Sequence, residues 1–383
     1  MKKRSGFGSI NRPEKFDPNE NNNHRFIERH LTGLPEVPVK TLSKFVWNWL
    51  CSVFCLALVL GWWFSPFAAN AADVKILNVS YDVTREFYQD FNQAFAEYWK
   101  NKTGDRVTIN QSHGGSSKQA QSVANGLEAD VVTMNQPTDI DLLHASGRLV
   151  PADWAARLPH HSVPYTSTIV FVVRKGNPKQ ITSWDDLTRS NVSVVIPNPK
   201  TSGNGRYSYL AAWGYAIRKP GATENSAREF VARLFANVPV LDTGGRGATT
   251  TFAERGIGDV LLTFENEAVQ VRKSLAADGL EVVVPSESIL AENPVAWVDR
   301  NVAKHHTEIV ARAYLEYLYS DTGQDLAAKY YFRPENQSVL SKHADRFKPL
   351  TLFTVDEVAG GWQKAQQKHF SDGGVFDQIY QNH

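Results

Sequence analysis

Short apolar runs alternate with longer amphipathic segments from Asp73 onward, and this alternation restricts the fold more than any other feature. Residues 74–81 have the pattern of a strand, and residues 84–102 place three phenylalanines on one face of a helix. The same patterns predict strands at 106–111, 129–134, 168–175, 192–197, 258–264 and 281–285, and helices at 117–125, 206–219 and 306–320. We expect the helix at 206–219 to be amphipathic. Alternating strands and helices predict an α/β fold with mixed, mostly parallel sheets.

The length and the prolines predict two lobes. About 312 residues follow position 71, which is enough for two domains of ordinary size. Pro151, Pro159 and Pro164 cluster between two sets of strands, as expected where a chain crosses between lobes. We therefore predict a division into the first part of lobe I (72–160), lobe II (161–264), and a return to lobe I with C-terminal helices that pack across the lobes (265–383).

The first 71 residues have a different composition. Residues 1–44 are polar, rich in Asn and Pro and without periodicity, which predicts a disordered extension. Residues 45–64 carry no charge, follow Lys44, and precede Ala69-Asn70-Ala71, which fits the cleavage site of an export signal. We expect residues 45–71 to be removed and the mature chain to begin near Ala72, in the periplasm. The alternative is an uncleaved anchor, because 20 apolar residues can span a bilayer.

Charge and cysteine content exclude several classes of function. Cys51 and Cys55 both lie in the apolar run, so the mature chain has no disulfide, zinc-thiolate site or cysteine nucleophile. Residues 1–71 contain nine of the 41 basic and five of the 40 acidic residues, which leaves a net charge of −3. A protein that binds nucleic acid needs a basic face, so this balance argues against that function.

The ends of four predicted strands share one chemistry. Tyr81-Asp82 ends the first strand. Three Gly- and hydroxyl-rich loops follow later strands, at 113–116, at 197–204 and, after the apolar run VPVL at 238–241, at 242–247. Ligands of open α/β sheets bind at the carboxyl ends of the strands, and a helix start offers free backbone N–H groups to an anion. A single such loop is more often a helix cap. Several of them in one two-lobed chain favour an anion site lined with donors.

Enzymatic motifs fail in detail. The stretch GGSSKQ does not have the spacing of a phosphate-binding P-loop, and residues 114–118 lack the last glycine of a nucleophile elbow. No acid stands at a spacing that would orient His113 as a base. Glu265 and Glu267 are candidate catalytic carboxylates, but they open a predicted helix, where acids suit the helix dipole in any case. We find no metal cluster and no cofactor motif.

At these residues the chain resembles the periplasmic sulfate-binding proteins of ABC import systems. The resemblance runs from about residue 74 to 380. It rests on LNVSYDVTREFY, QSHGGSSKQA, ADVVTMN, PYTSTIVFVVRKGNPKQI, IPNPKTSGNGRY, YLAAWGYA, GIGDVLLTFENEA, VPSESILAE and VAGGWQKAQ. It implies a two-lobed venus-flytrap fold of type II without catalysis, a dehydrated sulfate between the lobes, and delivery to a membrane permease. The ligand residues that it implies are Asp82 (through its N–H), Ser116, Ser202, Gly203, Asn204, Gly245 and, lining the site, Phe264.

The sequence departs from the family pattern at two of these positions. The family usually has Gly where Asn204 stands and Trp where Phe264 stands. Phe keeps an aromatic wall but offers no N–H donor, which predicts weaker discrimination between sulfate and thiosulfate. We expect the Asp82 carboxylate to point away from the anion and to cap the helix that begins near Thr84. The leading hypothesis is a monomeric sulfate receptor. The alternatives are a thiosulfate-preferring receptor and an exported α/β enzyme with an anion pocket.

Overall fold

The computed structural model describes residues 71–274 and 279–380. The chain divides into two units after Ala69, and all of these residues belong to the second unit, Asn70–His383. The predicted disordered extension and the predicted apolar signal segment lie outside the described residues. Within the described part, no helix is both long enough and apolar enough to cross a bilayer.

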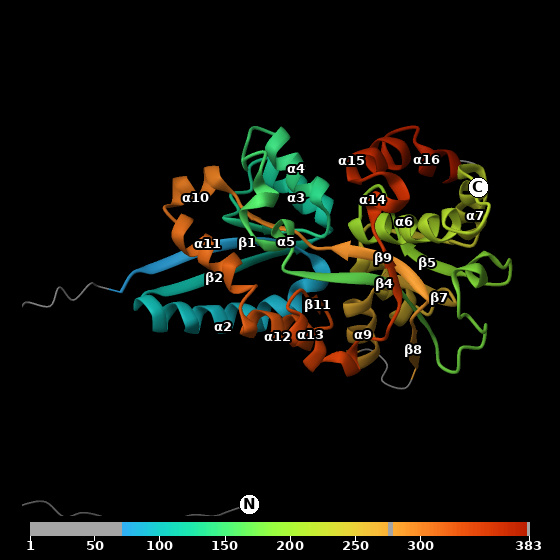
Figure 1. The fold of residues 1–383 in the computed structure, drawn as a ribbon, viewed down its shortest axis with the longest axis horizontal. Coiled ribbons are helices and arrows are strands. Elements are labelled where there is room, and N and C mark those ends of the chain that lie inside the picture. Colours follow the sequence, from blue (N-terminus) through green and yellow to red (C-terminus); the bar gives the residue numbers. More distant parts are fainter. Residues whose placement is uncertain (1–70, 275–278, 381–383) are drawn as a thin grey trace, which may run out of the picture. The chain divides into compact units, whose positions relative to one another are not determined.

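The first sheet has the strand order β10-β3-β1-β2. Its strands are β1 (Asp73–Tyr81), β2 (Arg106–Gly114), β3 (Val131–Thr133) and β10 (Val295–Trp297). Strand β1 pairs in parallel with β2 and β3, as the alternation predicts, and β10 closes the edge antiparallel to β3. Helix α2 (Arg85–Thr103) lies on one side of this sheet, and α3 (Ser116–Ala124) and α4 (Pro137–Ala145) lie on the other (Figure 1).

Helix α2 confirms the predicted aromatic face. Phe87, Phe91 and Phe95 are all fully buried, while the residues between them on the outer face are exposed. The ring of Tyr314 on α11 (Glu308–Tyr317) meets Phe91 and Phe95 edge to face, with centroids 5.2 and 5.1 Å away. Edge-to-face packing of buried rings adds to the free energy of area burial, so this cluster ties the C-terminal third of the chain to the first sheet.

The second sheet has the strand order β12-β9-β4-β7-β5-β6, and β8 and β11 also pair with β4. Its strands are β4 (Tyr165–Arg174), β5 (Val194–Pro197), β6 (Leu241–Asp242), β7 (Val260–Phe264), β8 (Leu280–Val283), β9 (Glu287–Glu292), β11 (Arg333–Pro334) and β12 (Thr351–Phe353). The predicted α/β fold with mixed sheets is confirmed, although parallel strand pairs are not in the majority. Among the described strands, β4 pairs antiparallel with four neighbours, so antiparallel pairs are as numerous as parallel ones.

The path of the chain also differs from the predicted division. Strands β8 and β9 still belong to the second sheet, and the chain rejoins the first sheet only at β10, later than position 265. It then crosses back, because β12 pairs with β9. We call the first sheet with its helices the first lobe, and the second sheet with its helices the second lobe.

The predicted amphipathic helix of the second lobe is α6 (Gly203–Ile217), and it is buried on almost every side. It lies between β9 and two other helices, α7 (Glu224–Ala236) and α14 (Val355–Ala359). A Cβ atom at Gly214 would lie 2.2 Å from the Phe353 ring. The amphipathic pattern was therefore the wrong interpretation, since the C-terminal helices cover the face expected to meet solvent.

The remaining helices complete the two lobes. They are α5 (Pro159–Ser162), α8 (Gly245–Thr249), α9 (Glu265–Ser274), α10 (Asp299–His305), α12 (Asp321–Lys329), α13 (Gln337–Lys342), α15 (Trp362–Ala365) and α16 (Val375–Tyr380). Helix α16 packs on α7, and α15 contacts α4 of the first lobe.

Candidate functional site

Four helical segments each follow a strand of the two sheets, and their starts lie close together. After β1 and β2 come the short 3-10 helix η1 (Asp82–Thr84) and α3, and after β5 and β6 come α6 and α8. A Cβ atom at Gly245 would lie 3.4 Å from Val83 Cγ1, and one at Gly115 would lie 3.4 Å from the Thr201 carbonyl oxygen. The loops that the sequence singled out are thus brought together from both lobes. The first N–H groups of a helix have no partner within the helix, so several donors converge here.

Gly203 lies at a close approach between the two lobes. It is the first residue of α6, and a Cβ atom there would lie 1.9 Å from Oδ1 of Asn135, which follows β3. Glycine is required at this position because the Asn135 amide of the first lobe occupies the space of any side chain.

The carboxylate of Asp82 does not make the predicted helix cap. The helix near Thr84 has no side-chain cap. Instead Oδ2 of Asp82 accepts a hydrogen bond from the Arg246 N–H at 3.3 Å. Burial raises the pKa of this carboxyl above its usual value, and the hydrogen bond and charge of Arg246 oppose that rise. The reason sequence reasoning missed this contact is that the partner belongs to α8, 164 residues away.

Ser116 is buried at the start of α3, and its hydroxyl is already engaged. It donates to Asp139 Oδ2 at 2.6 Å and accepts from the Asn135 N–H at 3.1 Å. Its proton is therefore committed to a carboxylate. What Ser116 offers to an anion in this arrangement is its backbone N–H.

Ser202 and Asn204 both lie at the start of α6 with their side chains turned to their own lobe. Ser202 is the N-cap, and its hydroxyl accepts from the Gly205 N–H at 3.3 Å. Asn204 donates through Nδ2 to Thr263 at 2.9 Å and accepts from Ser208 at 3.3 Å. The side chain that replaces the usual glycine is thus held away from the helix start, which leaves the backbone N–H of Asn204 unobstructed by its own amide.

Phe264 ends β7 and is 1% exposed. Its ring packs edge to face between Tyr207, at 5.7 Å, and Tyr81, at 6.3 Å. Tyr81 immediately precedes Asp82, so Phe264 packs against the residue that comes just before the start of η1. Phe264, Tyr207 and Tyr81 thus form a cluster of three buried rings.

An open cleft of about 1020 Å³ lies beside the helix starts. Both lobes line it, with Asp82, His113 and Lys118 from the first and Lys200 and Thr243 from the second. Ser116, Ser202 and Asn204 lie deeper, each at most 3% exposed. The candidate site therefore has a buried inner part, made mainly of helix starts, and a wider polar mouth.

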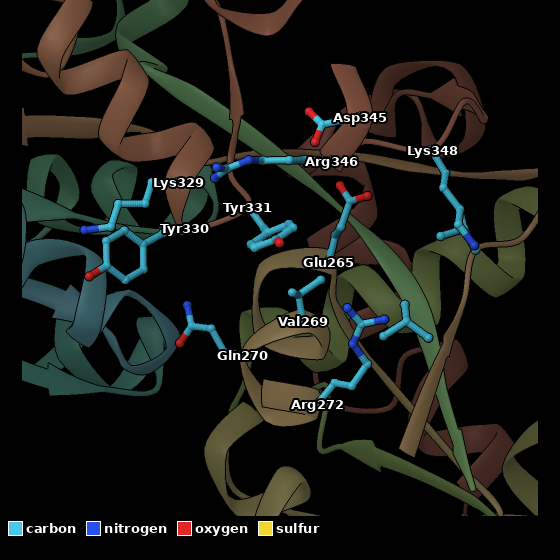
Figure 2. A pocket seen from close by; sticks show the side chains of 12 residues that line it. Glu265, Val269, Gln270, Arg272, Lys329, Tyr330, Tyr331, Asp345, Arg346 and Lys348 are labelled. Carbon is cyan, nitrogen blue, oxygen red and sulfur yellow. The ribbon is translucent and has the colours of Figure 1, made fainter. Parts of the chain in front are cut away.

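A second cavity of about 630 Å³ lies between α9, β8 and the segment from α12 to residue 348 (Figure 2). Glu265 lines it and is held by Arg333 through two hydrogen bonds of 2.7 and 2.9 Å. This carboxylate, a catalytic candidate in the sequence, is part of a buried ion pair. None of the predicted ligand residues lines this cavity.

Glu267, the other candidate carboxylate, lies with Arg246 beside the helix starts. Its Oε1 accepts from Thr249 at 3.0 Å and lies 3.6 Å from Arg246 Nε, while Oε2 is buried without a partner among the described residues. Arg246 also donates to both carboxylate oxygens of Glu86. Its charge is compensated by two acids. Within residues 71–274 and 279–380, no group of three acidic, His or Cys residues is placed to hold a metal ion.

The Glu267 carboxyl predicts a measurable pH dependence. Burial raises its pKa to about 7, with Arg246 opposing the rise. A carboxyl whose folded pKa exceeds its unfolded value stabilises the fold below the unfolded pKa, and this contribution is lost as pH rises to the folded pKa. As the pH rises from 5.5 to 8, the free energy of unfolding should therefore fall in the native chain. In Glu267→Gln this fall should be smaller by about 1–2 kcal/mol. Urea unfolding of both proteins, without ligand, measures this difference. Identical pH slopes would show that Glu267 is ionised throughout.

Asn135 lies against Gly203 at the candidate site but is not among the residues that the sequence predicted for it. The third strand also ends at the site, so the rule that ligands bind at carboxyl ends of strands applied to it as well. The end of this strand carries Asn and Gln, so it lacks the glycines and hydroxyls that mark the other strand ends.

Comparison with known proteins gives consistent matches. The family model for bacterial extracellular solute-binding proteins matches residues 81–333. The chain is 58% identical to a thiosulfate-binding protein from Pseudomonas aeruginosa, over 82% of this chain and 94% of that protein. It is 57% identical to a sulfate-binding protein from Salmonella typhimurium, over 81% of this chain and 94% of that protein.

Solved structures agree on the fold. A sulfate-binding protein from Mycobacterium tuberculosis superposes with a TM-score of 0.70 at 32% identity, covering 77% of this chain and 98% of that one. A periplasmic thiamin-binding protein superposes with a TM-score of 0.58 at 17% identity, covering 80% and 96%, which is a likeness of fold alone.

Proposed function

Because the chain belongs to the family of bacterial extracellular solute-binding proteins, we propose that it is a receptor that binds sulfate between its two lobes. The observation that carries the proposal is the meeting of four helix starts at Asp82, Ser116, Gly203 and Gly245, with space at Gly203 only for a residue without a side chain. The Asn204 N–H and the Ser202 hydroxyl belong to the same helix start as Gly203.

The chemistry of the site suits a fully ionised oxyanion. Sulfate carries no proton near neutral pH and offers only acceptors, which backbone N–H groups at helix starts can meet. A counter-charge is not required, and Arg246, beside the helix starts, is already paired with Glu86 and Glu267. A protonated phosphate brings a hydrogen that needs an acceptor, and an unpaired buried polar group is costly. This favours sulfate over phosphate.

Thiosulfate is the second ligand that we propose. Relatives named for sulfate and for thiosulfate are almost equally similar to this chain, at 57% and 58% identity, so overall similarity does not separate the two anions. Thiosulfate replaces one oxygen by a larger, softer sulfur that accepts hydrogen bonds poorly. Phe264 offers this sulfur an apolar ring in place of a donor.

We further propose that the protein works outside the cytoplasm as a monomer without a cofactor, and delivers its anion to the permease of an ABC importer. Relatives in the comparison are named as binding proteins, and both carboxylates considered for catalysis are engaged in other contacts. An export signal cleaved near Ala71 would place the new N-terminus just before β1, which begins at Asp73. Intact mass of the exported protein distinguishes this form from one that retains residues 45–64.

Calorimetry of the desalted mature protein tests the proposed function. Titration with sulfate, thiosulfate, phosphate and molybdate should give one bound sulfate or thiosulfate per chain. Phosphate should bind about 5- to 150-fold more weakly, since one unpaired buried polar group costs about 1–3 kcal/mol. Failure of both sulfur oxyanions to bind, or a preference for phosphate, would contradict the proposal.

Phe264→Trp should change the balance between the two anions. The indole N–H would add one donor to a charged acceptor, worth about 1.5–3 kcal/mol to sulfate and less to thiosulfate. The larger ring must fit between Tyr81 and Tyr207, which sets an overpacking cost of about 1–3 kcal/mol on stability. Competition calorimetry should show the ratio of sulfate to thiosulfate affinity rising in the variant. An unchanged ratio would show that position 264 does not touch the ligand.

A further inference from the structure

Asn135 combines deep burial with an unmet hydrogen-bonding group. The residue is 3% exposed, and its side-chain Oδ1 has no hydrogen-bond partner among the described residues. Buried polar atoms in folded proteins nearly always have a partner, so an orphaned one needs an explanation. An anion offers only acceptors, so a ligand at this position accounts for the orphaned oxygen when the amide turns and presents its Nδ2 instead.

The position of Asn135 is where the two lobes meet. Its backbone N–H donates to Ser116 Oγ at 3.1 Å, which fixes it at the start of α3 in the first lobe. Its side-chain amide faces the start of α6 in the second lobe, where a Cβ atom at Gly203 would lie 1.9 Å from Oδ1, 2.6 Å from Cγ and 2.7 Å from Nδ2. The amide therefore lies between two of the helix starts that carry the proposed function.

We propose that Asn135 is a further ligand-binding residue, whose side-chain Nδ2 donates a hydrogen bond to the bound sulfur oxyanion. The inference rests on the proposed function and assigns a new contact within that site. The oxygen and nitrogen ends of an amide differ by a half-turn about one bond and have almost the same shape. With an anion in the site, the end that carries hydrogens faces the ligand, and the orphaned acceptor turns away from it.

This role explains two features of the chain. An amide is a neutral donor, so it matches a site that holds a dianion with dipoles instead of cations. It also supplies a donor in a chain whose Phe264 provides an aromatic ring without one. A carboxylate of the same size would instead repel the anion, so the nitrogen of Asn135 is essential to the proposed role.

Calorimetry on two variants of the full mature chain tests the contact. Asn135→Ala should weaken sulfate binding about 10- to 150-fold, the equivalent of one hydrogen bond to a charged partner. Asn135→Asp keeps the shape and should weaken binding further. Asn110→Ala, an exposed asparagine on β2, is the matched control and should bind as the native protein does.

Stability without ligand separates a binding role from a structural one. Because the side-chain Oδ1 has no internal partner, Asn135→Ala should unfold in urea at nearly the native midpoint while it loses affinity. Native-like affinity in either Asn135 variant, or a loss of stability that parallels the loss of affinity, would overturn the inference. If the native chain itself binds neither sulfate nor thiosulfate, the proposed function fails, and that result is distinct from a failure of Asn135 alone.

Discussion

Gly203→Ala should weaken sulfate binding by more than about 100-fold while leaving the ligand-free protein folded. The new Cβ would lie 1.9 Å from Asn135 Oδ1 and 2.6 Å from its Cγ, so turning the amide does not relieve the clash. The lobes then stay apart unless Asn135 is displaced. Lobes that stay apart lose at least two donors to the anion, each worth about 1.5–3 kcal/mol, which gives the expected loss, whereas a displaced Asn135 loses one. Calorimetry measures the affinity, and urea unfolding without sulfate measures the stability.

Gly205→Ala is the matched control, two residues along the same helix. Its Cβ would lie 2.3 Å from the Pro197 carbonyl oxygen and 2.8 Å from Asn198, both within the second lobe. It should therefore lower stability with or without ligand, by about 1–3 kcal/mol. The double variant Asn135→Ala/Gly203→Ala removes the side chain that clashes and should bind sulfate better than Gly203→Ala alone. Equal loss of affinity in the two would show that the contact between the lobes is not what Gly203 protects.

Arg333→Gln should destabilise the fold by about 3–5 kcal/mol, because it leaves the buried Glu265 carboxylate without its partner. The side chains of Glu265 and Arg333 are 4% and 13% exposed and share two hydrogen bonds. Burial already raises the pKa of Glu265, and the positive charge of Arg333 opposes that rise. Without Arg333 the carboxyl takes up a proton more readily, so the deficit should be smaller at pH 5 than at pH 8.

Urea unfolding at the two pH values measures this effect. The exposed pair Arg312–Glu316 on α11 is the control, and Arg312→Gln should leave the unfolding midpoint unchanged. Glu265→Gln/Arg333→Gln removes both charges and should recover part of the loss. An Arg333→Gln deficit that is the same at pH 5 and pH 8 would show that Glu265 is not the source of the destabilisation.

Much of the fold could be predicted because strand and helix periodicities are local properties of the sequence. The strands that became β1, β4 and β7 and the aromatic face of α2 were all identified from spacing. The errors concern tertiary context. Helix α6 was expected to expose one face to solvent, but the C-terminal helices cover that face. Strands β8 and β9 belong to the second sheet because both pair antiparallel with the long strand β4.

The part of the candidate site that consists of backbone N–H groups at helix starts could be predicted from the sequence. Glycines and hydroxyls at strand ends mark helix starts such as Gly203 and Gly245, which the structure brings together. Side-chain partners across the lobes could not be predicted in the same way. The Asp82–Arg246 contact joins residues 164 positions apart, and the Gly203–Asn135 contact joins a strand end of one lobe to a helix start of the other.

The structure of the sulfate complex tests most directly whether helix starts hold the anion. We expect one sulfate between the lobes, with its oxygens about 2.7–3.2 Å from backbone nitrogens of Asp82, Ser116, Gly203, Asn204 and Gly245. We expect no cationic side chain in direct contact with the anion. A sulfate bound instead by Arg272, Arg346 or Lys348 in the second cavity, or held in the cleft by the charge of Arg246, would contradict this proposal.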